Sequence, residues 1–219
     1  MELLNVIKAR TVWLFDINDL NPKGKHIGQE FIKWLAESYK FSKVPSSSLD
    51  LDDTKALAFL FGGFGVGEET ITIDLRIYPD GAVADSRSST DHTDAFLKNV
   101  LELAEKKFGL TRRLDMVRKV IHLSELSVRC KHSLSGLNPK LKDIALKLSS
   151  LTGIPDRYSF DLFGIGFWND PQFPSGLSHF RIEKTLNVPA SENRYYSVAP
   201  LKTSDHLAIL DELEKLLPS

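Results

Sequence analysis

Three ionisable side chains alternate with apolar ones in the segment 177–185. His179, Arg181 and Glu183 are each two residues apart, so they share one face of a predicted strand. Such a face could form an acid–base or binding site, to which Arg194 from the next predicted strand would contribute. An exposed sheet surface with cross-strand ion pairs explains the same pattern, and it is the interpretation we favour.

Aromatic residues lie close to the prolines that follow the predicted strand 158–168. Trp168 and Phe173 lie close to Pro171 and Pro174 in the sequence. Aromatic side chains in a proline-stiffened loop are plausible anchors for a protein partner, because aromatic residues carry much of the binding energy of interfaces. They could equally fold back onto the core. Trp168 and Phe173 are therefore candidate binding residues, together with the polar set above.

The glycine-rich run 61–67 has the composition of a phosphate-binding loop but not its context. A phosphate loop leads into a helix and is usually followed by Lys and Ser or Thr. Here Glu68 and Glu69 follow, and their carboxylates would repel a phosphate. We expect a glycine-rich hairpin or bulge instead.

The lone cysteine and the six histidines do not form a recognisable catalytic or metal-binding pattern. Cys130 and His132 are expected on one strand face, where neighbouring side chains seldom give the geometry of a nucleophile and its base. No His-x-x-x-His spacing or His-Glu-x-x-His core is present. The sequence predicts no catalytic residue, no metal site and no cofactor, and a structural thiol at Cys130.

One polar dipeptide occurs twice. Asp91-His92 and Asp205-His206 each follow a hydroxyl residue at the start of a predicted helix. A hydroxyl at this place caps free backbone N–H groups, and an acid in the first turn interacts favourably with the helix dipole. This explains the two aspartates and leaves the two histidines unexplained.

Apolar periodicity and turn residues predict the elements that position these side chains. The segment 70–78 alternates between apolar and polar residues, which is typical of a half-buried antiparallel strand. Gly109 stands where the C-cap of the helix before it belongs. Strands are predicted at 11–17, 56–62, 70–78, 82–86, 117–131, 158–168, 177–185 and 194–198, and helices at 26–40, 91–108, 139–151 and 207–217.

The two halves of the chain share short signatures in the same order. Leu20-Asn21-Pro22-Lys23 recurs as Leu137-Asn138-Pro139-Lys140, and Phe-Gly and Asp-His pairs follow in both halves. We expect an α+β fold with antiparallel sheets covered by helices, built by duplication of a β-α-β-β-β-α unit. The predicted repeats are 1–110 and 111–219, which can also pack as one globular unit.

Composition excludes several classes of protein. Apolar residues make up 42% of the 219 residues and the formal net charge is −1, as in an ordinary globular protein. One cysteine excludes a disulfide framework, and the longest uncharged run is too short for a membrane span, so we expect a cytoplasmic protein. Charge is uneven: 48–94 holds ten acidic and three basic residues, and 111–147 holds nine basic and three acidic ones.

We expect a non-enzymatic protein-binding or assembly module, of which an inhibitor or immunity-type protein is a special case. Its partner would be another protein or a second copy of the chain, such as a homodimer. One alternative is a nucleic-acid-binding protein that uses the basic segment 111–147. The other is an enzyme with its site on the face of His179, Arg181 and Glu183.

Overall fold

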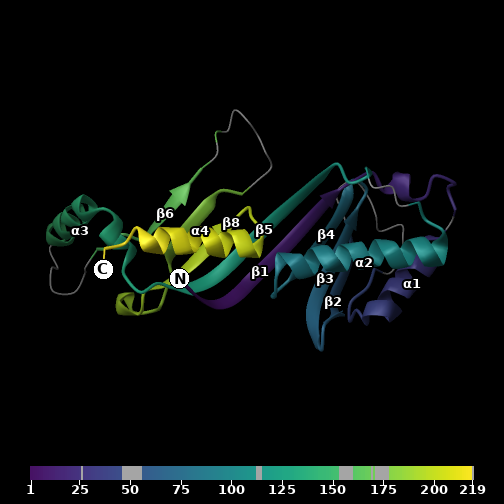
Figure 1. The fold of residues 1–219 in the computed structure, drawn as a ribbon, viewed down its shortest axis with the longest axis horizontal. Helices are drawn as coiled ribbons and strands as arrows, with labels where there is room; N and C mark the ends of the chain where they lie inside the picture. The colour runs from purple at the N-terminus through teal and green to yellow at the C-terminus, as the bar shows by residue number, and fades with distance from the viewer. Residues whose placement is uncertain are drawn as a thin grey trace. The chain divides into compact units, whose positions relative to one another are not determined.

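The computed structural model describes residues 1–25, 27–45, 56–111, 115–152, 160–168, 170 and 178–218 (Figure 1). The helices of this part are α1 (Gly28–Tyr39), α2 (Thr90–Phe108), α3 (Pro139–Leu151) and α4 (Thr203–Lys215). The strands are β1 (Glu2–Leu14), β2 (Leu57–Val66), β3 (Glu69–Tyr78), β4 (Gly81–Ser86), β5 (Lys119–Arg129), β6 (Gly164–Phe167), β7 (Phe180–Lys184) and β8 (Arg194–Ala199).

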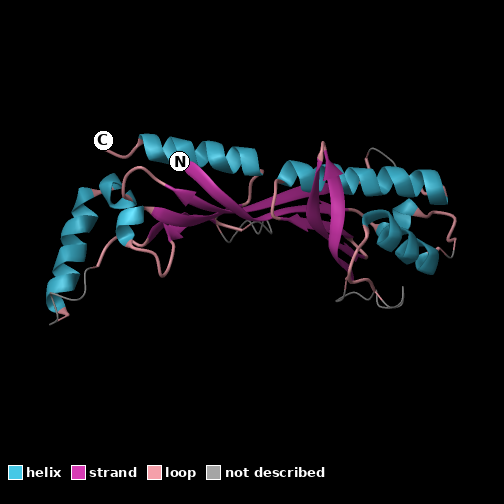
Figure 2. Cartoon of the chain, turned by 90° about the horizontal axis from the view of Figure 1, so that it is seen from below, coloured by secondary structure: helices cyan, strands magenta, loops and turns pink. Residues whose placement is uncertain are grey.

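The eight strands form one sheet in the order β2-β3-β4-β1-β5-β8-β7-β6. Short turns join β2 to β3 and β3 to β4, and the neighbours β2 with β3, β3 with β4, and β7 with β8 run antiparallel. Figure 2 shows long helices lying along the strands. The expected α+β class with an antiparallel sheet covered by helices is confirmed. Within the described ranges, no helix is both long and apolar enough to cross a membrane.

Two compact units divide the chain, and each has its own core. Unit 1 consists of Met1–Val6, Glu125–Pro200 and Ser204–Ser219, and unit 2 of Ile7–Ser124 and Leu201–Thr203. Strands β1 and β5 therefore contribute residues to both units. This division differs from the expected repeats 1–110 and 111–219, because each of the two strands changes unit in its middle.

In unit 2, α1 and α2 cover one face of the sheet. The alternation of β3 buries Ile73, Leu75 and Ile77 beneath these helices, as the sequence pattern predicts. Trp34 of α1 and Phe108 of α2 contact each other edge-on, with ring centroids 5.4 Å apart. The opposite face of β3 carries polar side chains such as Asp74 and Arg76, and none of the described helices covers it.

In unit 1, α4 covers one face of the strands β5, β8, β7 and β6. Buried apolar side chains from the strands meet Leu210 and Leu213 of α4 in the core. The hydroxyl of Tyr195, which is fully buried, accepts a hydrogen bond from the backbone N–H of Leu134 at 3.1 Å. Helix α3 buries only Ala145 and stands apart from this core.

Several element boundaries differ from expectation. Strand β1 begins at Glu2 instead of residue 11, because the charged residues Lys8 and Arg10 alternate with the buried residues Ala9 and Thr11 on the two sheet faces. Strand β5 ends at Arg129, so the expected shared strand face of Cys130 and His132 is wrong. Cys130 is a free, buried thiol.

The glycine-rich run forms the predicted bulge and hairpin. The register of β2 against β3 shifts between Phe59 and Gly62, and Phe61 inside this bulge has a φ of 58°. The ring of Phe41 lies 2.5 Å from where a Cβ on Gly62 would stand, so only glycine fits there. Gly67, with a φ of 61°, turns the chain into β3.

Candidate functional site

The predicted polar strand face exists on the side of unit 1 that α4 does not cover. Strands β7 and β8 are antiparallel, with Glu183 opposite Tyr196 and Arg181 opposite Val198. The Arg181 guanidinium lies 5.8 Å from the centroid of the Tyr196 ring. The Tyr196 hydroxyl donates a hydrogen bond to the Glu125 carboxylate of β5 at 2.6 Å. The site residues of three strands thus meet on one face.

Sequence reasoning found Arg181, Glu183 and Arg194 but missed Glu125 and Tyr196. The signal for Tyr196 was present, because it is two residues from Arg194 and so shares its face of β8. Glu125 had no such signal, because it lies beside β8 only through the pairing of two strands that are distant in the sequence.

The residues of this face differ in exposure. His179 lies just before β7 and is exposed, whereas Arg181, Glu183 and Arg194 are half-buried. The Nε atoms of Arg181 and Arg194 are buried without a hydrogen-bond partner. Arg194 also lies 3.8 Å from the carboxylate of Glu192. The face thus combines one exposed residue with three half-buried ones, so whether it is a binding site or a solvated sheet surface stays a prediction.

The surroundings of Tyr196 set the protonation of its hydroxyl. Burial raises the pKa of the Tyr196 hydroxyl, and the neighbouring Glu125 carboxylate raises it further, to about 12, against an opposing effect of Arg181. Tyr196 therefore stays protonated near neutral pH and acts as a hydrogen-bond donor. A general acid or base works best with a pKa near the working pH, and Tyr196 is far from it.

The two repeated Asp-His pairs occupy the starts of helices, as predicted. Asp91 and Asp205 lie in the first turns of α2 and α4, and the N-cap hydroxyl of α2 comes from Ser89, which accepts from the Asp91 N–H at 3.1 Å. His92 Nδ1 lies 2.6 Å from the Ser88 hydroxyl.

His206 is a fully buried packing residue on the helix-covered face of unit 1. Its Nε2 lies 2.8 Å from the hydroxyl of Ser197, which itself donates to the Arg181 carbonyl at 2.9 Å. Ser197 has one hydrogen to donate, so it accepts from Nε2–H, and Nδ1 is left buried without a partner. Burial lowers the pKa of His206 to about 4, which keeps the ring neutral.

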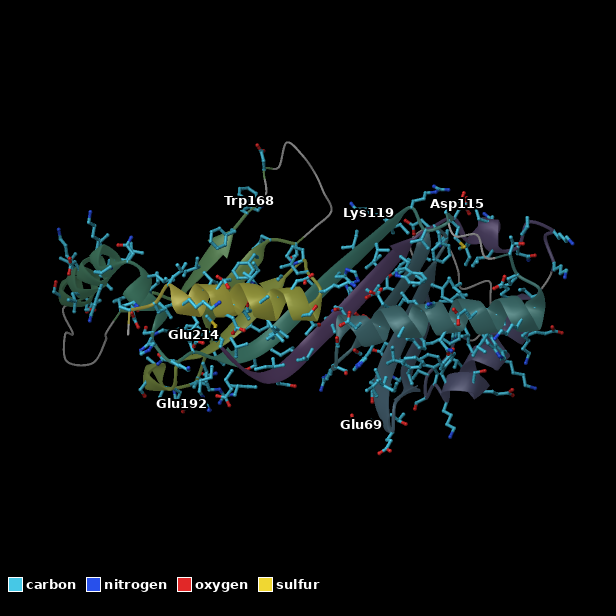
Figure 3. All side chains as sticks on the ribbon, viewed as in Figure 1. Glu69, Asp115, Lys119, Trp168, Glu192 and Glu214 are labelled. Carbon is cyan, nitrogen blue, oxygen red and sulfur yellow. The ribbon has the colours of Figure 1, made fainter. Side chains whose placement is uncertain are left out.

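The aromatic candidates lie on the sheet edge of unit 1. Trp168 directly follows β6 and is 77% exposed, and Phe167 is 60% exposed with its ring 5.7 Å from that of Phe180 (Figure 3). Phe173 lies outside the described residues. Of the two predicted anchors, Trp168 is thus placed where a partner can reach it.

Helix α3 carries the largest group of exposed apolar residues on any described helix. Four of them are spaced three, four and three residues apart, which places them on one helix face. They are 39% to 73% exposed: Leu141, Ile144, Leu148 and Leu151. Leu146 is also exposed but points to another side of the helix. This face is called the α3 apolar face.

The basic residues of 111–147 are spread over several elements. Arg118 precedes β5 and lies 3.8 Å from Asp19, and Arg129 at the end of β5 donates to Glu2 at 3.2 Å. Three lysines of the segment lie on α3. The described part of 111–147 therefore does not form one continuous basic surface.

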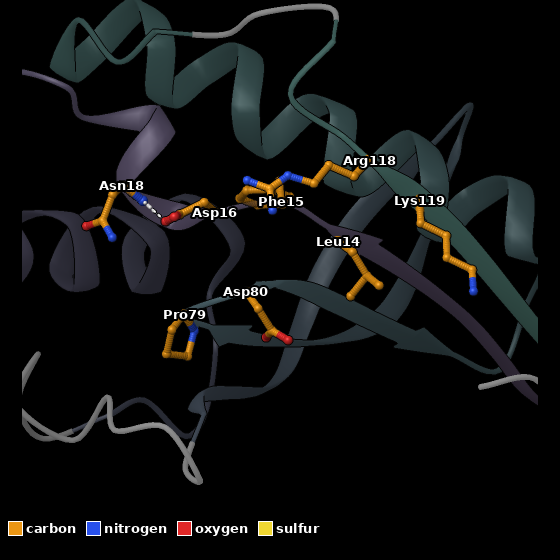
Figure 4. Close-up of a pocket in the computed structure, with 8 residues that line it drawn as sticks. All are labelled: Leu14, Phe15, Asp16, Asn18, Pro79, Asp80, Arg118 and Lys119. Carbon is orange, nitrogen blue, oxygen red and sulfur yellow. Dashed lines mark hydrogen bonds between the residues drawn. The ribbon is translucent and has the colours of Figure 1, made fainter. Parts of the chain in front are cut away.

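A cavity of about 490 Å³ lies at the end of β1 in unit 2 (Figure 4). Arg118 and Lys119 line it together with Asp16 and Asp80. Asp16 accepts a hydrogen bond from the Asn18 N–H at 2.9 Å, and so caps the short turn that follows β1. Its carboxylate has a structural role in this turn.

Comparison with known proteins gives little further information. No protein-family model matches the chain, and no curated protein matches it. Among solved structures, the chain is similar to one described as Methanococcus jannaschii TBP, with 12% identity and a TM-score of 0.42. That match covers 98% of this chain and 97% of the other. A likeness of this degree carries no conclusion about function.

Proposed function

We propose that this chain is a non-enzymatic, cytoplasmic protein-binding module that docks to another protein through the α3 apolar face. The observation that supports it most strongly is the exposure of Leu141, Ile144, Leu148 and Leu151 on one side of a helix that buries only Ala145. Burying a Leu or Ile side chain contributes about 1.5–3 kcal/mol, so four exposed ones represent a large unused binding energy. Amphipathic helices with this spacing commonly dock into apolar grooves.

The charges around the face indicate the chemistry of the partner. Lys140 and Lys147 lie one turn away from Ile144 and Leu151, and border the apolar face along one side. Asp143 lies one turn before Lys147, next to that lysine and away from the apolar face. The expected partner therefore has an apolar groove with acidic residues at its rim.

A different protein fits this face better than a second copy of the chain. In a two-fold symmetric dimer the same patch meets itself, so the lysine rims of two α3 helices would approach each other. Like charges in close contact are unfavourable and suppress such pairings. Self-association through α3 is thus the weaker of the two forms of this proposal.

The test compares one variant on the face with one on the opposite side of the same helix. Ile144→Glu places a charge in the centre of the α3 apolar face, and Ser150→Glu places the same charge on its far side, where Ser150 is exposed. Proteins retained by the immobilised wild-type chain are identified, and each is then purified and titrated against all three forms. We expect one protein whose affinity falls at least about tenfold with Ile144→Glu and is unchanged with Ser150→Glu.

Two results would overturn the proposal. In the first, no purified protein discriminates between Ile144→Glu and Ser150→Glu. In the second, sedimentation velocity shows a wild-type dimer that Ile144→Glu alone dissociates, which would assign the face to self-association. Circular dichroism of both variants establishes that α3 is still folded.

The internal duplication is also kept as a proposal. Helices α2 and α4 each begin beside hydroxyl residues and carry an Asp-His pair in the first turn, at Asp91 and Asp205. We expect residues 11–110 to superpose on 118–217 with α2 matched to α4 in an experimental structure. Matched helices on opposite faces of the two half-sheets would contradict a common origin.

A further inference from the structure

Unit 2 contains a second candidate site, unrelated to α3, on the sheet face that α1 and α2 leave open. A cavity of about 450 Å³ lies there, within the size range of small-molecule pockets. Four cationic side chains and two carboxylates line it: Lys8, Arg10, Arg76, Arg87, Asp74 and Asp85. We propose that this cavity binds a nucleotide, with its phosphate on the cationic side chains and its base against Phe61.

Each of the two carboxylates of the cavity has a hydrogen-bond partner within the protein. Asp85 accepts from Arg10 Nε at 2.7 Å and Nη2 at 2.9 Å, and from Arg76 Nη1 at 2.7 Å. Asp74 accepts from the backbone N–H of Phe61 at 2.7 Å. Four cationic side chains against two carboxylates leave the cavity lining with a formal excess of two positive charges.

Asp85 also holds the two guanidinium groups in place. It is only 8% exposed, and it anchors Arg10 from β1 and Arg76 from β3 on either side of β4. Both arginine side chains remain about one-third exposed, so part of each guanidinium faces the cavity. Arg76 bonds Asp85 through Nη1, and a guanidinium fixed in this way can present its outer N–H groups to phosphate oxygens.

Phe61 supplies an aromatic surface at the same cavity. It lines the cavity and is 55% exposed, although large apolar side chains are usually buried. Its φ of 58° lies in the left-handed region, which phenylalanine rarely adopts and which costs energy. The bulge and the hydrogen bond to Asp74 hold the residue in this conformation.

An exposed ring beside arginines matches a ligand with one flat and one anionic part. In a nucleotide the base is the flat part and the phosphate is the anionic part. Any of the bases can stack on an aromatic side chain. The same chemistry is offered by a free mononucleotide and by one residue of a single strand. The cavity has room for one such unit.

The experiment titrates the full chain with four probes by calorimetry at low ionic strength. The probes are AMP, inorganic phosphate, adenosine and single-stranded tetraadenylate. We expect AMP to bind more tightly than phosphate, and phosphate more tightly than adenosine. If tetraadenylate binds more tightly than AMP and AMP displaces it, the natural ligand is a single strand. If tetraadenylate binds more weakly than AMP, the natural ligand is a free nucleotide.

Two variants separate the roles of the ring and the charge. Phe61→Asn removes the ring with a residue that tolerates positive φ, and should weaken AMP binding at least about fivefold while leaving phosphate binding unchanged. Arg87→Gln, at an exposed position, should weaken AMP and phosphate binding alike. Arg118→Gln lies outside this cavity in the same unit and should change neither. Melting temperatures within a few degrees of the wild type verify folding.

The proposal fails if the wild-type chain binds neither AMP nor phosphate at millimolar concentration. It also fails if phosphate binds as tightly as AMP and Phe61→Asn has no effect, because the site would then recognise an anion without a base. Equal losses with Arg87→Gln and Arg118→Gln would show non-specific attraction by the charge of the protein.

Discussion

Arg10 and Asp85 stand directly opposite each other on β1 and β4 and form a two-point ion pair. Arg10 Nε and Nη2 donate to the two carboxylate oxygens of Asp85 at 2.7 and 2.9 Å. Burial alone would raise the pKa of the Asp85 carboxyl, but Arg10, assisted by Lys8 and Arg76, lowers it below its ordinary value. The carboxylate is therefore charged inside the sheet because two arginines surround it.

Asp85→Asn should destabilise unit 2. The change leaves Arg10 and Arg76 without their counter-charge, and we expect a loss of about 1–3 kcal/mol in the free energy of unfolding, since the arginines are partly solvated. Urea denaturation at pH 7 measures the loss. Because the native pKa of Asp85 is lowered, its contribution is complete above about pH 4 and is lost as the pH falls further. A difference between the two proteins that stays constant down to pH 3 would contradict this.

His206 should make the protein less stable in mild acid. Its native pKa of about 4 lies below the ordinary value of 6.5, so the unfolded chain takes up a proton first as the pH falls. The free energy of unfolding should decrease by about 2–3 kcal/mol between pH 6.5 and pH 4 through this group. His206→Gln keeps an N–H donor for Ser197 but cannot titrate, and should flatten this part of the pH profile. Parallel profiles of the two proteins would refute the assignment.

Tyr196→Phe should weaken unit 1 modestly. The hydroxyl that donates to Glu125 at 2.6 Å is lost, while the ring beside Arg181 is kept. We expect a cost of about 0.5–1.5 kcal/mol in denaturant unfolding, the usual net value of one hydrogen bond. Glu125→Gln is the matched control, because its amide oxygen still accepts from Tyr196 and should cost less. A larger loss for Glu125→Gln would show that the carboxylate has another role.

Gly109→Ala should destabilise the C-terminus of α2. Gly109 has a φ of 64° and its N–H bonds the Glu105 carbonyl at 2.9 Å, which is the C-cap geometry the sequence predicted. Among the described residues, only the Lys25 ammonium comes near a new Cβ, at 3.8 Å, so the cost of about 1 kcal/mol arises from backbone strain. Gly109→Asn should cost less, because asparagine tolerates this conformation. A higher melting temperature for Gly109→Ala than for Gly109→Asn would disprove the explanation.

Local patterns account for what could be predicted from the sequence. The alternation of 70–78 and the capping residues around α2 depend on neighbours in the chain, and the structure confirms β3 and α2 within one residue. The face of Arg181 and Glu183 is also local, since it follows from the two-residue period of one strand.

Features that depend on distant pairing could not be predicted. The hydrogen bond of Tyr196 to Glu125 needs β8 to lie beside β5. The ion pairs of Asp85 with Arg10 and Arg76 need β1, β4 and β3 to be paired in the right register. The early start of β1 was hidden because Lys8 and Arg10 are charged, and the pairing of Arg10 with Asp85 depends on a strand that is distant in the sequence. The positive φ of Phe61 follows from the bulge and has no sequence signal of its own.

The division of β1 between the two units has a consequence for synthesis on the ribosome. Residues Met1–Val6 are made first but belong with Glu125–Pro200 and Ser204–Ser219, whereas Ile7–Ser124 leave the ribosome as a nearly complete unit. Domains generally fold in the order in which they emerge. Residues Met1–Val6 therefore stay without their unit until β5, their neighbour in the sheet, has been made. A chaperone that held Met1–Val6 would delay the folding of unit 1 and leave that of unit 2 unaffected.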